Sequence, residues 1–306
     1  MIEVLYDCDL TMGLPDRDVD DGLALLYLLG RPDVRLHGIT STFGNSTLEE
    51  VHLCLERTLP ELGAAHIPLH RGADGPERGD SPAARFLAET VAANPGRFCL
   101  LATGSLTNLA DAARLDTGFF AGLARLVVMG GATGPMELGE RRVDELNFSA
   151  DPAAARMVLH SSDRLTVVTG NLCLPLCLER GRFETWLERL RARSLGGFAG
   201  YLETKLLPWF AHMRATCGLD GFPPWDATAA VCLTDPELFD RRTWRIAPTL
   251  EEPCAGLLSQ AGQTAGPASR VHIPARVLDL ESYWRVLMES WEEFGRSPAF
   301  RKTRYG

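Results

Sequence analysis

VLYDCDLTMG, Val4–Gly13, is a short apolar run that ends in two carboxylates, Asp7 and Asp9, followed by Thr11. An apolar run of this length with polar neighbours is typical of a buried β-strand. A carboxylate at the end of such a strand is costly unless something pairs with it. The stretch predicts a strand, and it leaves open whether its carboxylates form a nucleophile, a metal site or neither.

Strand-like and helix-like patterns alternate along the chain after this stretch. We expect strands at Glu3–Tyr6, Val34–Ser41, Ile67–His70, Phe98–Ala102, Leu126–Met129 and Leu165–Val168, and helices at Asp20–Leu29, Leu106–Leu115 and Asp151–Ser161. Repeated β-α units are typical of a parallel sheet covered by helices. The sequence therefore predicts one α/β domain over residues 1–306, with a mostly parallel, Rossmann-like central sheet flanked by helices.

Local signals place the remaining elements. Ser46 and Glu49 have the spacing of a capping box, and Ser81 precedes a proline, so each predicts a helix start. We then expect a helical region over Leu174–Met213, a turn at Gly218–Pro224, a helix at Asp226–Leu233, short strands and turns over 243–275 with a loop near Ser259–Ala268, and a closing helix at Asp279–Phe294.

The composition is that of a globular protein with a sizeable core. Charged residues make up 23% of the 306 residues and the net charge is -9, so bulk electrostatics do not favour a nucleic-acid partner. No apolar run is long enough to span a membrane, and the N-terminus lacks a signal-like pattern, which predicts a cytoplasmic protein. The 8 cysteines include Cys173 and Cys177 at close spacing, but no second pair completes a zinc site.

Polar residues gather where the predicted strands end. They are Asp7, Asp9, Asn45, Gly104–Asn108, Gly130–Gly131 and Asn171. Open parallel sheets bind ligands at the carboxyl ends of their strands. We therefore expect a ligand site at this edge of the sheet.

One interpretation of the opening carboxylates is a phosphoryl-transfer nucleophile. D-x-D-x-T after an apolar strand resembles the first motif of the haloacid-dehalogenase-like phosphatases, and LLATGS resembles a later one. That chemistry also needs a positioned lysine, and only Lys205 and Lys302 occur, both in unsuitable contexts. The lysine content disfavours this interpretation.

A second interpretation is a site for a hard cation. Asp20 and Asp21 open a predicted helix shortly after Asp7 and Asp9. Carboxylates this close raise one another's pKa unless a cation lies among them, and an oxygen-rich site suits calcium. Helix capping and the helix dipole are the alternative explanation for Asp20 and Asp21, but they do not account for four grouped acids.

The second interpretation agrees with a resemblance to the inosine-uridine preferring nucleoside hydrolase family. D-x-D followed by DD at the start of an apolar helix resembles the opening motif of that family. Further segments resemble its motifs in the same order: GITSTFGN, LLATGSLTNLA, LVVMGGA, DELNFSADPAAARMV and WDATAAVCLTDPELF. The matches run from about residue 2 to residue 240.

The resemblance implies calcium-dependent hydrolysis of the N-glycosidic bond of a nucleoside. It places Ca²⁺ on Asp9, Asp21, Asp226 and the backbone carbonyl of Val128, with Asp9 also taking a proton from water and Asp7 supporting it. It assigns the ribose hydroxyls and the surrounding pocket to Asp20, Asn45, Glu145 and Asn147. Such carboxylate and amide oxygens would stabilise the positive charge that develops on the sugar as the base leaves. Members of the family are commonly dimers or tetramers, so the resemblance also implies a homo-oligomer.

This chain departs from the usual family pattern in three places. Trp225 precedes the metal-binding Asp where the pyrimidine- and inosine-cleaving branch has a histidine that acts as the acid; the purine-preferring branch has tryptophan there. Its indole would stack on a purine base, although a structural role in the core is the alternative. Gly139 replaces an asparagine near the sugar's 5′ end, and the loop Leu10–Val19 is enlarged. We expect this loop to close over the sugar.

Two further hypotheses stay open beside purine nucleoside hydrolysis. Arg141 or Arg142 would meet an anionic or unusual 5′ group, which predicts a hydrolase of a different N-riboside, although a solvated loop also explains them. The absence of a histidine at any motif position would fit a weakly active, ligand-binding relative. The aromatic residues Phe43, Phe86, Trp209 and Phe222 are expected in the core rather than in the base pocket.

Overall fold

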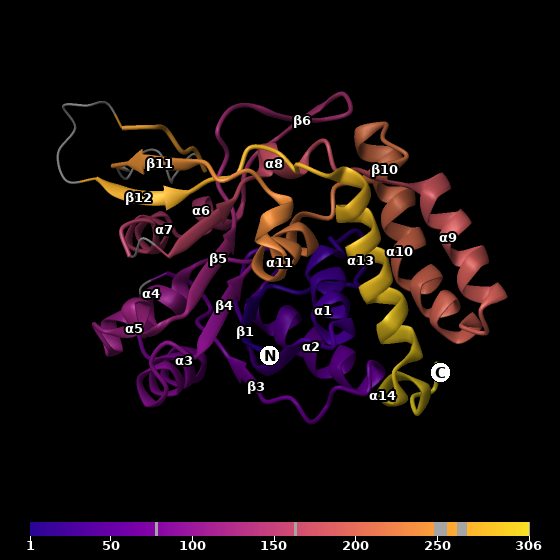
Figure 1. The fold of residues 1–306 in the computed structure, drawn as a ribbon, viewed down its shortest axis with the longest axis horizontal. Coiled ribbons are helices and arrows are strands. Elements are labelled where there is room, and N and C mark those ends of the chain that lie inside the picture. The colour runs from indigo at the N-terminus through magenta and orange to yellow at the C-terminus, as the bar shows by residue number, and fades with distance from the viewer. Residues whose placement is uncertain (77–78, 162–163, 248–255, 262–267, 306) are drawn as a thin grey trace.

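The computed structural model describes residues 1–76, 79–161, 164–247, 256–261 and 268–305. An eight-stranded sheet runs through one α/β domain in the order β11-β12-β8-β5-β4-β1-β2-β3 (Figure 1). Its strands are β1 (Ile2–Cys8), β2 (Val34–Ser41), β3 (Leu69–Arg71), β4 (Phe98–Ala102), β5 (Arg125–Met129), β8 (Leu165–Val168), β11 (Thr243–Ile246) and β12 (Ser269–His272). All neighbouring strands are parallel except β11 and β12. The predicted fold class is confirmed.

Helices cover both faces of the sheet because alternate strand residues point to opposite sides. In β1, Val4 and Tyr6 enter the larger apolar core, whereas Leu5 enters the smaller one. The larger core packs against α1 (Asp20–Gly30), α2 (Leu48–Glu61), α9 (Arg180–Ala192), α10 (Gly196–Cys217), α11 (Trp225–Thr234) and α13 (Leu280–Arg296). The smaller core packs against α3 (Pro82–Ala93), α4 (Thr107–Leu115), α5 (Phe119–Gly122) and α7 (Pro152–Leu159).

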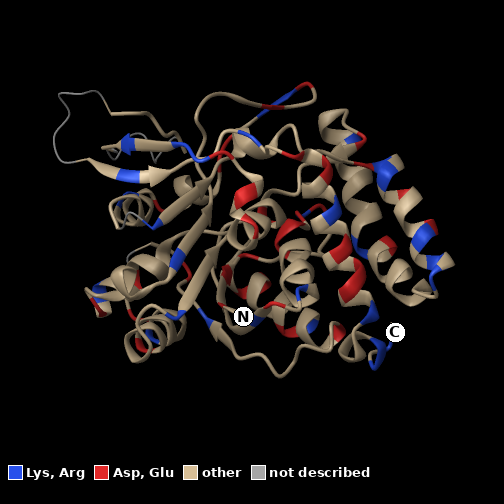
Figure 2. Cartoon of the chain, viewed as in Figure 1, with Lys and Arg blue, Asp and Glu red and all other residues tan. Residues whose placement is uncertain are grey.

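Shorter elements complete the fold. They are the hairpin of β6 (Met136–Leu138) and β7 (Arg141–Val143), the short pair β9 (Leu178–Glu179) and β10 (Gly221–Phe222), α6 (Asn147–Ala150), α8 (Gly170–Cys173), the 3-10 turn Pro236–Leu238 and α14 (Pro298–Arg301). In Figure 2 acidic segments of the ribbon lie at the centre of the molecule, whereas basic segments are prominent on the peripheral helix α9.

Several predicted boundaries are wrong for identifiable reasons. Helix α2 is capped by Thr47, whose hydroxyl accepts the Glu50 N–H, so the capping box starts one residue later than Ser46. The strand expected at Ile67–His70 is β3, Leu69–Arg71, because its register is set by pairing with β2. The helical region Leu174–Met213 is divided at Ser194, which has φ +63°, and the turn before Pro224 contains β10.

Other predictions are confirmed more closely. The helix expected at Asp226–Leu233 is α11, and Asp279 caps the closing helix α13. The loop predicted near Ser259–Ala268 falls partly outside the described residues. None of the helices in the described ranges is long and apolar enough to cross a membrane. The cytoplasmic location and the homo-oligomeric state stay predictions.

Candidate active site

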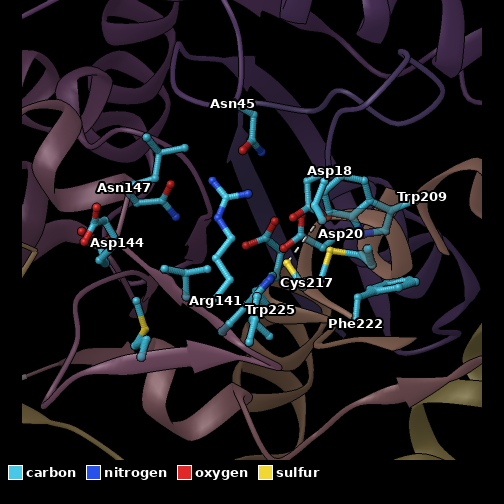
Figure 3. Close-up of a pocket in the computed structure, with 18 of the residues that line it drawn as sticks. Asp18, Asp20, Asn45, Arg141, Asp144, Asn147, Trp209, Cys217, Phe222 and Trp225 are labelled. Carbon is cyan, nitrogen blue, oxygen red and sulfur yellow. Dashed lines mark hydrogen bonds between the residues drawn. The ribbon is translucent and has the colours of Figure 1, made fainter. Parts of the chain in front are cut away.

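A cavity of about 460 Å³ opens at the carboxyl edge of the sheet. The ends of β4 and β5, the starts of α1 and α11, the β6–β7 hairpin and one side of α10 surround it. Figure 3 shows Trp209 and Phe222 on one side, with Asp18 and Asp20 next to Trp209, and Asn147 on the opposite side, with Asn45 between the two sides. The cavity therefore has one side suited to a flat ring and one suited to hydroxyl groups.

Three buried carboxylates lie close together, and two of them, Asp20 and Asp226, line the cavity. Asp20, Asp21 and Asp226 each place an oxygen within 4.8 Å of the other two. Burial and mutual repulsion raise the pKa of Asp20 and Asp226 well above the ordinary value, and burial raises that of Asp21. Within the described residues no Lys or Arg forms an ion pair with any of the three; Lys205 pairs with Glu61 instead. A divalent cation with oxygen ligands fits this set.

Asp9 and Asp21 lie beneath the cavity and do not line it. Asn45 connects them, because its side-chain amide donates to Asp9 Oδ1 at 3.2 Å and to Asp21 Oδ2 at 3.3 Å. Tyr6 and Thr103 also donate to Asp21, at 3.3 and 2.7 Å. Neither Tyr6 nor Thr103 was predicted as a site residue, because Tyr6 belongs to an apolar strand and Thr103 directly follows one.

Glycines leave the space that Asp9 needs. A Cβ at Gly44 would come within 2.1 Å of Asp9 Oδ2, and one at Gly104 within 3.0 Å of its Cγ. No side chain is tolerated at the first distance, so the ends of β2 and β4 approach this carboxylate only because they carry glycine.

Asp7 is fully buried and lies away from the cavity. Its Oδ1 accepts hydrogen bonds from Thr40 and from Asn108, the latter at 2.8 Å. Burial raises the pKa of Asp7 to about 7 against the opposing effect of these bonds. Asp7 thus ties β1 to β2 and α4, a supporting position. Val128 is buried in β5, next to Met129, which lines the cavity.

Glu145 and Asn147 both line the cavity, but their side chains differ in which atoms already form hydrogen bonds within the protein. The Glu145 carboxylate accepts the N–H groups of Phe148 and Ser149 and thereby caps α6. Asn147 donates its amide hydrogens to the carbonyls of Thr103 and Met129, each at 3.0 Å. Its side-chain oxygen is therefore the atom left for a ligand.

The aromatic side contains more residues than the sequence suggested. Trp225 lines the cavity at the start of α11, one residue before Asp226, and Trp209 and Phe222 line it as well (Figure 3). Phe222 is buried in the larger core and Trp209 packs against that core, as expected, but both residues also line the cavity. Phe86 of α3 instead stacks on His70.

The enlarged loop Leu10–Val19 reaches the cavity through Asp18. Thr11 donates to the Asp18 carbonyl at 2.9 Å and so joins the two ends of the loop. Burial raises the pKa of Asp18 to about 6. Asp16 of the same loop contacts His212 of α10, a cavity residue that no motif indicated. Closure of the loop over a sugar stays a prediction.

The β6–β7 hairpin brings Arg141 and Arg142 to the cavity. Gly139 forms its turn with φ +60°, and a Cβ there would lie 2.0 Å from the Cys217 carbonyl, so glycine is required by the turn and its close contact with α10. In Figure 3 the Arg141 side chain extends between Asn147 and Asp20. Arg141 and Arg142 are both exposed to solvent, as the solvated-loop interpretation predicts, and both also line the cavity.

Comparisons with known proteins agree on one family. A family model described as inosine-uridine preferring nucleoside hydrolase matches residues 4–285. The pyrimidine-specific ribonucleoside hydrolase RihB of Escherichia coli O17:K52:H18 is 27% identical, over 94% of this chain and 96% of that protein. A purine-preferring ribonucleoside hydrolase from Gardnerella vaginalis has a similar fold, with a TM-score of 0.81 and 21% identity over 96% of this chain and 99% of that one. The plant nucleoside hydrolase PpNRh1 has a TM-score of 0.78 and 22% identity over 95% and 98%.

Proposed function

The chain belongs to the inosine-uridine preferring nucleoside hydrolase family, whose members hydrolyse N-glycosidic bonds of ribonucleosides, and from this we propose a calcium-dependent hydrolase of purine ribonucleosides. The products would be ribose and the free base. The observation that carries the proposal is the set of buried carboxylates, Asp20, Asp21 and Asp226, at a cavity of nucleoside size.

Calcium is the cation we propose because every available ligand is an oxygen and the ligand set is rich in carboxylates. Asp9, Asp21, Asp226 and the Val128 carbonyl would hold it. Its contribution to the chemistry would be to lower the pKa of water at the site. The Asp9 carboxylate, oriented by Asn45, would then accept a proton from the attacking water.

The polar side of the cavity would bind the sugar. Asp20 would accept a hydrogen bond from the ribose 2′-hydroxyl, and Glu145 and Asn147 would bind the outer hydroxyls. As the C1′–N bond lengthens, positive charge develops on the ribose ring. The carboxylates of Asp20 and Glu145 and the free oxygen of Asn147 would stabilise that charge where it forms.

The aromatic side would bind the base. Trp225 and Trp209 offer ring faces, and stacking on such faces suits a bicyclic purine better than a single ring. One relative, however, is a pyrimidine-specific hydrolase. The preference for purine bases therefore needs a direct assay.

The test is release of reducing sugar from a panel of purine and pyrimidine ribonucleosides, with and without a chelator. Release from purines that stops with the chelator and returns with Ca²⁺ supports the proposal. Release from pyrimidines alone refutes the purine assignment. Tight calcium binding without release from any substrate would instead support a ligand-binding relative with weak activity.

A second candidate substrate class is favoured by Arg141. Its guanidinium extends into the cavity, and no partner holds it among the residues that the structure describes. Arginine recognises phosphate and carboxylate through paired hydrogen bonds. An N-riboside that carries an anionic group, such as a 5′-phosphate, would use it. Comparing cleavage of a ribonucleoside with cleavage of its 5′-monophosphate tests this alternative.

A further inference from the structure

His212 occupies a defined position in the wall of the cavity. Its Nδ1 lies 3.0 Å from Oδ1 of Asp16, and its ring stacks on Trp209 with 5.0 Å between centroids and 8° between planes. The two contacts come from different elements, the loop Leu10–Val19 and α10 itself. They fix both the plane of the imidazole and the direction of one nitrogen.

The Asp16 contact determines which nitrogen remains for a ligand. A carboxylate that accepts from Nδ1–H leaves Nε2 as the other site of protonation, and no described residue bonds to Nε2. Asp16 has φ +55°, a backbone conformation that asparagine and aspartate tolerate better than other side chains. With Thr11 closing the loop onto Asp18, the loop presents Asp16 to α10 rather than to open solvent alone.

We propose that His212 donates a proton to the departing base, an inference that rests on the proposed function. The C1′–N bond breaks and its electron pair stays on the base, so a ring nitrogen of the base takes the proton from His212 Nε2. Water oxygen bonds to C1′, and its proton goes to the Asp9 carboxylate. One proton is given and one is taken, so the step balances, and both groups return to their starting states by exchange with solvent.

Two observations favour His212 over other cavity residues. It stacks on Trp209 and so belongs to the aromatic side, where a base would lie, whereas Trp225 has no proton to give at neutral pH. Asp18 is the rival donor, because it lines the cavity and its pKa is raised by burial. Figure 3 shows Asp18 beside both Asp20 and Trp209, but one Asp18 oxygen already accepts the Val19 N–H at 2.6 Å, whereas Nε2 of His212 has no bond among the described residues.

A leaving group that needs no proton separates this role from a structural one. We compare His212→Gln with the parent protein on the best purine nucleoside and on 4-nitrophenyl β-D-ribofuranoside, whose nitrophenolate departs unprotonated. The expected result is a loss of kcat of about 100-fold or more on the nucleoside and less than about 3-fold on the nitrophenyl riboside. His66→Gln, at an exposed histidine outside the cavity, is the control for both substrates.

The outcomes are distinguishable. Equal losses on both substrates, or none on the nucleoside, overturn the inference while leaving the proposed function intact. A selective loss on the nucleoside in Asp18→Asn but not in His212→Gln also overturns it and transfers the role to Asp18. If the parent protein cleaves neither substrate, the proposed function itself fails.

Asp16 is a positioning residue in this scheme. Asp16→Asn keeps a hydrogen-bond acceptor for Nδ1–H, and Asp16→Gly removes it, while both tolerate the left-handed backbone. We expect Asp16→Gly to lower kcat on the nucleoside about tenfold with little change in KM, and Asp16→Asn to retain more of the activity. Equal losses of kcat from the two variants on the nucleoside, or a loss from Asp16→Gly on the nitrophenyl riboside as large as on the nucleoside, would overturn the positioning role.

Discussion

The backbone N–H of Asn45 donates a hydrogen bond of 2.6 Å to Oδ2 of Asp9. This bond joins the carboxyl ends of β1 and β2, which are parallel neighbours in the sheet. Because the Asn45 side chain holds the other Asp9 oxygen, the carboxylate has a single orientation. A group that must accept a proton from one particular water molecule benefits from such fixation.

We expect Asp9→Asn to reduce kcat on the best nucleoside by about 1,000-fold, since the amide cannot take the proton. The substitution keeps the size of the side chain but turns an NH2 group toward one of the two Asn45 donors, so kcat is measured well below the thermal midpoint of the variant. Asp151→Asn is the matched control, because Asp151 is also buried but caps α7 away from the cavity. Activity of Asp9→Asn within tenfold of the parent would show that Asp9 is not the base.

Asp226→Asn should have opposite effects on stability with and without calcium. In a chelator it relieves repulsion among buried carboxylates, so the thermal midpoint should equal or exceed that of the parent protein. With calcium at about 100 times its Kd, the parent should gain about 2.7 kcal/mol and the variant much less. Calorimetry in both buffers measures this. An unchanged calcium gain in the variant would exclude Asp226 as a ligand, and an equal gain with Mg²⁺ would contradict the choice of metal.

Trp225→Ala should weaken catalysis on purine nucleosides more than on pyrimidine nucleosides. Stacking of a base on an aromatic ring contributes about 1–3 kcal/mol, which corresponds to a loss in kcat/KM of roughly 5- to 150-fold. Trp225→Phe should retain most of the activity because a ring face remains. Trp244→Ala, in the edge strand β11, serves as the control. Parallel losses on both classes of base would mean that Trp225 supports the fold rather than the base.

Arg141→Ala should discriminate between plain and phosphorylated ribosides. If Arg141 binds an anionic 5′ group, KM for a ribonucleoside 5′-monophosphate should rise about tenfold or more, since hydrogen bonds to charged groups contribute about 1.5–3 kcal/mol. KM for the unphosphorylated nucleoside should change less than about threefold. Arg35→Ala, at the far end of β2, is the comparison variant. A parent protein that does not cleave the monophosphate would rule out this substrate class.

Local patterns predicted the sheet well because each strand has its own signal. Val34–Ser41, Phe98–Ala102 and Leu165–Val168 were predicted with their observed bounds. These strands are apolar runs with polar or glycine-rich ends, and the run itself determines the element. The least accurate predictions concern the boundaries of elements, such as the bounds of β3 and the division of the helical region at Ser194. Pairing or packing with distant segments decides these boundaries.

The sequence by itself determined the alternation of strands and helices, the sheet edge where the polar residues gather, and the proximity of Asp7 and Asp9 to Asp20 and Asp21, whereas the addition of Asp226 to this group came from the family resemblance. Those features follow from residue periodicity and from the rule that parallel strands end at one edge. Only the tertiary structure decided that His212 meets Asp16, 196 residues away, and that Arg141 extends into the cavity. Such contacts depend on how α10 and the β6–β7 hairpin pack over the sheet. The spacing of residues within either segment does not predict that packing.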